Sequence, residues 1–219
     1  MRTLAILPIK SFSQAKQRLR SELSEADRRA LVDSMFSDVL VALRRVSELE
    51  GIIVVSGDRV AQRIAQGYGA TVVEDDERGH NSAVGEGIRT ALEDGIERVL
   101  LVPGDCPLLD PKEIEELLNH RAGERSALIV PDRHGTGTNA LLLTPPDVLA
   151  PSFGPDSCRR HMADAAMAGV PAEVVEVPCL AIDVDTPDDL DALQQQLADS
   201  RGGAAHTRGM LNQLLRARS

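Results

Sequence analysis

Aromatic side chains are scarce in this chain of 219 residues, which has one Tyr, three Phe and no Trp. Aliphatic residues and alanine must therefore fill the core that a hydrophobic content of 42% supports. The shortage also argues against binding of single-stranded nucleic acid, which uses aromatic stacking platforms. A formal net charge of −10 argues against non-specific binding to nucleic acid or to an anionic membrane, but a small anionic ligand can still bind near local basic residues.

Cysteine is also rare. Cys106, Cys158 and Cys179 lie far apart and form no CxxC motif, so we expect reduced thiols rather than a zinc site or a disulfide framework. No apolar stretch is long enough to span a bilayer, and the first strand-like run starts too close to Met1 for a signal peptide. We therefore expect a cytoplasmic protein without nucleic-acid or membrane partners.

The familiar phosphate-binding and hydrolase motifs are absent. No GxGxxG follows the first apolar run, and neither GxxxxGK[ST] nor GxSxG occurs in the chain. These absences argue against a dinucleotide-binding domain, a P-loop enzyme and the commonest α/β-hydrolase signature.

The first half of the chain alternates short apolar runs with helical patterns. Wholly apolar strands that alternate with helices predict a largely parallel α/β sheet covered on both faces. Ser24, followed by Asp27 three residues later, is a plausible helix start. The predicted strands are 3–9, 51–55, 71–73 and 98–102, and the predicted helices are 24–46, 60–66, 82–93 and 111–119.

The second half has a different rhythm, which indicates added or antiparallel strands. No linker-like boundary occurs before about residue 200, so we predict one domain over 1–198. Residues 199–219 form a tail that we expect to be either flexible or packed on a partner, and the oligomeric state stays open. The predicted strands here are 127–130, 140–143, 172–177 and 180–184, and the helices are 156–168 and 187–197.

Three cations, Lys10, Lys16 and Arg18, follow the first predicted strand. Ligands of open α/β sheets bind at the carboxyl ends of the strands, and three cations at that edge suit a triphosphate. The alternative is a solvated basic face, which is common and is favoured for this segment taken alone.

Three carboxylates follow other predicted strands. Asp105 comes just after 98–102, while Asp183 and Asp185 are two residues apart and would point the same way from a strand. Carboxylates from separate strand ends can share a magnesium ion, which prefers oxygen ligands. For Asp185 a helix-capping role ahead of Thr186-Pro187 is an equal alternative.

Two further segments suit a phosphate or a carboxylate. In the loop 131–140, PDRHGTGTNA, glycines allow close backbone approach and Thr138 and Asn139 add polar groups; the alternative is a polar connection between strands. Gly154 and Ser157 bracket a helix start, where N–H groups and the helix dipole favour anions; the alternative is an ordinary capped helix. His161, one turn after Ser157, could face the same ligand or be structural.

Taken together, five segments resemble the guanylyltransferases of coenzyme F-420 biosynthesis, which act on 2-phospho-L-lactate or phosphoenolpyruvate. The resemblance covers roughly residues 3–197 and implies the nucleotidyltransferase fold shared with molybdenum-cofactor guanylyltransferases and sugar nucleotidyltransferases. The order of five separate motifs is more specific than any one of them. The segments are 7–10 with 15–19, 104–108, 131–133 with 135–139, 153–161 and 183–187.

The resemblance implies transfer of GMP from GTP onto the acceptor phosphate with release of pyrophosphate. Lys10, Lys16 and Arg18 would lie along the triphosphate, with Lys16, Arg18 and Asp105 catalytic, and Asp105 and Asp185 holding magnesium. Thr138 or Asn139, Gly154 and Ser157 would bind the three-carbon acceptor. Because a phosphate monoester is mostly dianionic at neutral pH, the acceptor needs no general base. The alternatives are a nucleotidyltransferase for molybdopterin or a sugar phosphate, and a non-catalytic nucleotide-binding domain.

Overall fold

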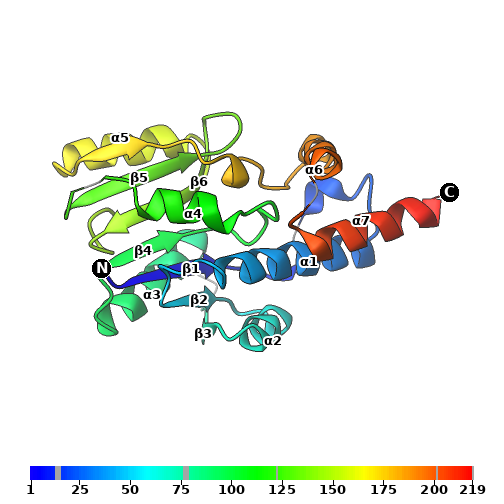
Figure 1. Cartoon of the computed structure of the whole chain (residues 1–219), viewed down its shortest axis with the longest axis horizontal. Helices are drawn as coiled ribbons and strands as arrows, with labels where there is room; N and C mark the ends of the chain where they lie inside the picture. The colour runs from blue at the N-terminus through cyan, green and yellow to red at the C-terminus, as the bar shows by residue number, and fades with distance from the viewer. Residues whose placement is uncertain (13–15, 76–78, 122, 201, 219) are drawn as a thin grey trace.

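A computed structural model describes residues 1–12, 16–75, 79–121, 123–200 and 202–218. Within these residues the chain forms one seven-stranded sheet in the order β3-β2-β1-β4-β6-β5-β7 (Figure 1). The strands are β1 Thr3–Pro8, β2 Gly51–Val55, β3 Thr71–Val73, β4 Arg98–Leu101, β5 Ser126–Pro131, β6 Thr138–Thr144 and β7 Ala172–Val174.

The sheet is mixed but mostly parallel, as predicted. β1 pairs in parallel with β2 and β4, and β2 does so with β3. β6 runs antiparallel to both β4 and β5, while β7 is parallel to β5. The change of rhythm in the second half of the sequence therefore marks the antiparallel β5–β6 hairpin, which joins the sheet beside β4.

Helices cover both faces of the sheet because its central strands are apolar on both sides. Leu4 and Ile6 of β1 pack on one face, with α3 and α5, while Ala5 and Leu7 pack on the other, with the remaining helices. The helices are α1 Glu25–Leu43, α2 Arg59–Gly67, α3 His80–Glu93, α4 Pro111–Leu118, α5 Ser157–Met167, α6 Pro187–Asp199 and α7 Ala205–Arg218.

The helix starts follow the capping rules. Ser24 accepts a hydrogen bond from the Asp27 amide, as predicted for the start of α1. Asp110 caps α4 ahead of Pro111, which occupies the first turn. None of the described helices combines the length and the apolar character that crossing a bilayer requires.

The predicted strand at 180–184 is wrong, and β7 ends at Val174 rather than at residue 177. Residues Pro178–Leu180 form a short 3-10 helix, and the amide of Val184 donates to the Asp105 carbonyl rather than to a strand ladder. Ile182 and Val184 are nevertheless buried while Asp183 and Asp185 are not. This alternation imitates the period of a strand and explains the wrong prediction.

The tail, predicted to be flexible or packed on a partner, contains α7, which packs along α1 of the same chain (Figure 1). The Asp38 carboxylate in α1 accepts hydrogen bonds from the His206 amide and from both the amide and the hydroxyl of Thr207, at 2.7–3.0 Å. Leu211 adds a buried apolar contact. The tail is therefore continuous with the core beneath α1.

Candidate active site

A cavity of about 580 Å³ opens at the carboxyl ends of β1 and β4. This is the edge at which open α/β sheets bind ligands, and the volume is typical of a small-molecule site. The structure brings nearly all of the predicted site residues to this cavity although they are up to 175 positions apart. Those lining it are Lys10, Arg18, Asp105, Thr138, Asn139, Gly154, Ser157, Asp183 and Asp185.

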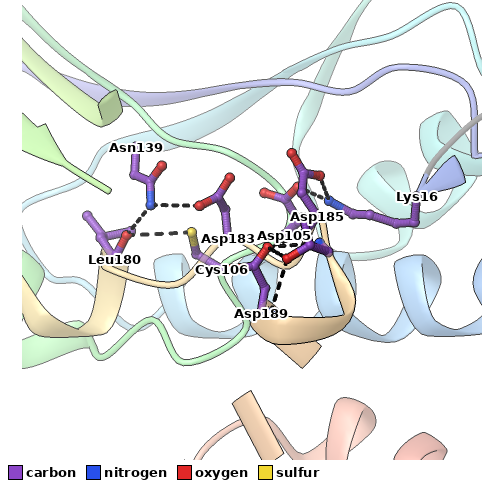
Figure 2. A network of polar contacts seen from close by, with 9 residues as sticks. Lys16, Asp105, Cys106, Asn139, Leu180, Asp183, Asp185 and Asp189 are labelled. Atoms are coloured by element: carbon purple, nitrogen blue, oxygen red, sulfur yellow. Dashed lines mark hydrogen bonds and ion pairs between the residues drawn. The ribbon is translucent and has the colours of Figure 1, made fainter. Parts of the chain in front are cut away.

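Lys16 lines an adjoining cavity and joins two of these carboxylates, Asp105 and Asp185. Its ammonium donates to Asp105 Oδ2 and to Asp185 Oδ1, the latter at 2.7 Å (Figure 2). Only 6% of the Lys16 side chain is exposed, compared with 25% for Asp105 and 53% for Asp185. We call Lys10, Lys16, Arg18, Asp105 and Asp185 the charged wall of the cavity.

The backbone around the charged wall is specialised. Lys16 has a left-handed conformation, with φ of 54°, which is unfavourable for a residue with a side chain and marks strain at a functional position. Gly104, directly before Asp105, lies so close to Ile9 that a Cβ atom there would be 2.3 Å from Ile9 Cδ1. Glycine therefore allows the loop that carries Asp105 to pack on the core.

The charges shift one another's protonation. Burial by itself would lower the pKa of Lys16, but the charges of Asp105 and Asp185 outweigh burial and raise it, so the ammonium stays protonated. Burial raises the pKa of Asp183 to about 6, and the neighbouring charges of Asp105 and Asp185 act in the same direction. The site therefore concentrates negative charge that Lys16 only partly balances.

Asp185 does not cap α6. Thr186 does, through a capping box in which its hydroxyl accepts from the Asp189 amide and Asp189 accepts from the Thr186 amide. Asp189 also accepts from the Asp185 amide and pairs with Arg133 at 2.7 Å. The Asp185 carboxylate therefore lines the cavity and does not cap α6. Its backbone amide is connected through Asp189 to Arg133 in the loop after β5.

The charged wall fits a magnesium ion. Asp105 Oδ1 is buried and has no hydrogen-bond partner among the residues that the structure describes, whereas Asp105 Oδ2 and Asp185 Oδ1 are held by Lys16. In the described part of the chain, no three His, Cys, Asp or Glu side chains gather into a metal cage. Two carboxylates are nevertheless what Mg²⁺ commonly takes from a protein when substrate phosphates and water complete its shell.

The glycine-threonine loop between β5 and β6 is organised by its own Asp132. One carboxylate oxygen of Asp132 accepts from the amides of His134 and Thr136, and its carbonyl accepts from Gly135. The amides of these three residues are therefore bonded within the loop itself. The loop lines the cavity with Asp132, Thr136 and Gly137 as well as with Thr138, the first residue of β6.

Thr138 and Asn139 have different partners. The side-chain amide of Asn139 donates to the Leu180 carbonyl at 2.7 Å and to Asp183 Oδ1 at 3.3 Å (Figure 2). Asn139 thus holds the segment that leads to Asp183, while the Thr138 hydroxyl contacts His161 at 3.0 Å. This division favours Thr138 over Asn139 as the residue that reaches a ligand.

The start of α5 and the residues just before it also line the cavity. Ser157 is its first residue and only 1% exposed, and Gly154 has φ of 126°, which glycine accommodates. The amides of Ser157 and Cys158 donate to the carbonyls of Gly154 and Thr136, so the predicted free N–H groups are wrong at these two positions. We call Thr138, Gly154 and Ser157 the hydroxyl wall.

Sequence reasoning missed several residues that hold these walls. Asp132 and the Arg133–Asp189 pair organise the loop after β5, and Asp132 ahead of a glycine-rich stretch was the available signal. Asn81 of α3 exchanges two hydrogen bonds with the Phe153 backbone, at 2.9 and 3.3 Å. Nothing in the sequence pairs Asn81 with a residue 72 positions away.

The sheet order and the cavity at its carboxyl edge are those of the nucleotidyltransferase fold. The chain superposes on a solved nucleotidyl transferase from Methanothermobacter with a TM-score of 0.65, at 16% identity over 90% of this chain and 98% of that one. The family model "Guanylyl transferase CofC like" matches residues 3–214. The chain belongs to this family, and the match extends past residue 197 into α7.

Curated relatives agree with this family. A phosphoenolpyruvate guanylyltransferase of Conexibacter woesei is 54% identical over 218 residues, which is 99% of this chain and 98% of the relative. A 3-phospho-D-glycerate guanylyltransferase of Colwellia psychrerythraea is 36% identical, over 88% and 91%. A 2-phospho-L-lactate guanylyltransferase of Methanothermobacter thermautotrophicus is 31% identical, over 87% and 83%. The predicted family, fold and enzyme class are confirmed.

Proposed function

We propose that this chain transfers GMP from GTP onto the phosphate of phosphoenolpyruvate or 2-phospho-L-lactate, releasing pyrophosphate, as a step of coenzyme F-420 biosynthesis. The observation that carries the proposal is that Asp105, Asp185 and Thr138, from three distant segments, line one cavity. The 54% identity to a phosphoenolpyruvate guanylyltransferase over nearly the whole chain supports phosphoenolpyruvate as the first acceptor to test.

On the nucleotide side, the charged wall neutralises the triphosphate. Lys10 and Arg18 are exposed cations that line the cavity and would lie along the phosphates. Magnesium held by Asp105 and Asp185 would supply a Lewis acid that offsets the charge of the triphosphate. Lys16 keeps the two carboxylates together despite their mutual repulsion.

On the acceptor side, the hydroxyl wall holds a small phosphorylated acid. The acceptor phosphate is already mostly dianionic at neutral pH, so it attacks the α-phosphorus without a base, and the charge of the pyrophosphate leaving group is met by the cations. What the protein must provide is the alignment of two anions, because proximity and orientation supply much of such a rate enhancement. Thr138, Gly154 and Ser157 line the same cavity as the charged residues and suit that role.

The test is pyrophosphate release by the purified chain with GTP and magnesium, using phosphoenolpyruvate, 2-phospho-L-lactate, 3-phospho-D-glycerate and a sugar phosphate as acceptors. We expect release with one of the first two, dependence on magnesium, and a preference for GTP over ATP. Tight GTP binding without release for any acceptor would indicate a binding domain. Release with the sugar phosphate alone would move the chain to a different substrate class.

A further inference from the structure

His161 is fully buried in α5, and both of its ring nitrogens have a partner. The Ser152 amide donates to Nε2 at 2.9 Å, and Nδ1 lies 3.0 Å from the Thr138 hydroxyl oxygen. A backbone N–H can only donate, so Nε2 must carry the lone pair. In a neutral imidazole the proton is then on Nδ1, and Nδ1–H donates to Thr138 Oγ1.

This assignment fixes the direction of the Thr138 hydroxyl. Its oxygen accepts from His161, so its own hydrogen has to be donated to something else. Among the described residues, His161 is the only hydrogen-bond partner of Thr138 Oγ1, and Thr138 lines the cavity. We propose that His161 is a positioning residue that makes Thr138 a hydrogen-bond donor to an anionic oxygen of the acceptor; this inference rests on the proposed function.

The surroundings keep the imidazole neutral. Burial, the largest influence, and the neighbouring Arg160 lower the pKa of His161 to about 4, although Asp164 acts in the opposite direction. A protonated ring would carry hydrogens on both nitrogens and lose the Ser152 amide. The direction of the Thr138 hydroxyl is therefore constant over the pH range in which the acceptor phosphate is a dianion.

The segment that fixes the ring is itself fixed. Arg160 donates to the Ser152 carbonyl at 2.6 and 3.2 Å, and the Ser152 hydroxyl donates to Asp164 at 3.1 Å. The Phe153 ring packs edge-on against the His161 ring, with centroids 5.3 Å apart. His161 thus joins Thr138 on β6 to the segment that carries Gly154, which couples both parts of the hydroxyl wall.

A donated hydrogen selects its partner. The Thr138 hydroxyl offers a hydrogen to an oxygen that can only accept, such as a phosphate or carboxylate oxygen. A threonine that was free to rotate could accept from a ligand hydroxyl as well. A hydrogen bond to a charged group contributes more free energy than a hydrogen bond between neutral groups. Loss of this arrangement should therefore weaken binding of the anionic acceptor.

The experiment is a double-mutant cycle of Thr138→Val and His161→Phe, which remove the hydroxyl and the ring nitrogens while keeping similar shapes. We expect each single variant to raise the KM for the acceptor about tenfold and to leave the KM for GTP within about twofold. The double variant should be no worse than either single one, because both remove the same interaction. His161→Asn, whose amide can occupy the Nδ1 position, should restore much of the acceptor affinity.

Additive effects in the cycle, or equal loss of affinity for GTP and acceptor, would make His161 merely structural. If His161→Phe fails to fold, the ring nitrogens of the wild-type protein decide instead: NMR should find Nδ1–H at neutral pH, and Nε2–H would overturn the proposal. The proposed function is overturned by a different result, namely that wild-type protein releases no pyrophosphate with any acceptor. The NMR measurement of the His161 ring can be made whether or not the protein is active, so the two failures can be distinguished.

Discussion

The charged wall and the hydroxyl wall of the cavity are held by different forces. In the charged wall, one buried ammonium holds two carboxylates that would otherwise repel each other. One carboxylate oxygen of Asp105 is left without a hydrogen-bond partner in the described part of the chain. In the hydroxyl wall, the neutral ring of His161 is held by the Ser152 amide and directs the hydroxyl of Thr138. The first arrangement suits a cation that completes the charge balance, and the second suits an anion that accepts a hydrogen.

The largest expected effect comes from removing a carboxylate of the charged wall. Asp105→Ala should lower the rate of pyrophosphate release at least about a hundredfold, because the unpaired oxygen that we assign to magnesium is lost. The fold should persist, since Asp105 lies in a loop after β4. Steady-state rates at several magnesium concentrations measure the loss of activity, and circular dichroism measures whether the fold persists.

The matched control is Asp191→Ala, which removes an exposed carboxylate of α6 outside the cavity. It should keep the wild-type rate. A circular dichroism spectrum typical of an unfolded protein for Asp105→Ala would assign that residue a structural role. The charged wall would then no longer be supported as the magnesium site.

Asn139→Leu tests a residue that belongs to neither wall but holds the segment carrying Asp183. The Leu180 carbonyl would lose its amide donor and keep only the weak thiol donor of Cys106, so we expect a loss of roughly 1–3 kcal/mol in the free energy of unfolding. The same amide holds Asp183, which lines the cavity and interacts electrostatically with Asp105 and Asp185, so the rate should fall about tenfold. Substrate titrations should show a lower kcat with little change in the KM for the acceptor. A selective rise in that KM would instead place Asn139 in the acceptor site.

Asp38→Ala separates the cavity from the distant α7. The variant removes the carboxylate that accepts from His206 and Thr207, so we expect a loss of about 2 kcal/mol in the free energy of unfolding. The rate of pyrophosphate release should not change, because Asp38 does not line the cavity. Chemical denaturation and an activity assay check this, and a loss of activity without a loss of stability would link α7 to catalysis.

The smallest expected effect is the dependence of stability on pH through His161. Its pKa is lowered to about 4 in the folded state from an ordinary 6.5, so folding favours the neutral ring. The stabilisation is complete above the ordinary pKa and is lost as the pH falls from there towards 4. Between about pH 7.5 and pH 5.5 it should decrease by about 1 kcal/mol.

The measurement compares wild type with His161→Phe at each pH, because the raised pKa of Asp183 changes stability in the opposite direction and is common to both proteins. The difference in unfolding free energy should shrink as the pH falls. A constant difference would mean that the ring titrates normally and that the hydroxyl wall is not built on a neutral histidine.

Much of this protein could be predicted from local sequence. Apolar runs such as 98–102 specify strands because branched aliphatic residues suit a sheet buried on both faces. Ser24 marks a helix start because its side chain accepts from a first-turn amide, and Pro111 marks one because it has no amide hydrogen to satisfy. The carboxyl-edge position of Lys10 and Asp105 follows from the parallel topology. The family resemblance rests on the same local motifs, and the predicted family was confirmed.

The segment 180–184 shows why local sequence was not enough there. Its alternating burial imitates a strand, but Pro178 and the hydrogen bonds of Ala181 and Val184 to loop residues take it away from the sheet. Equally, nothing local indicates that the loop amides after Asp132 are already bonded or that Lys16 lies between two distant carboxylates.

The sequence by itself determined the class of fold, the edge of the sheet at which ligands bind and the residue types gathered there, because those follow from periodicity and chain direction. Only the tertiary structure decided which of these groups is bonded to which. Asp185 is not a cap, Asn139 holds a loop, and Thr138 receives a hydrogen from His161. Hydrogen bonds and ion pairs between residues 23 to 169 positions apart depend on packing that no local pattern specifies.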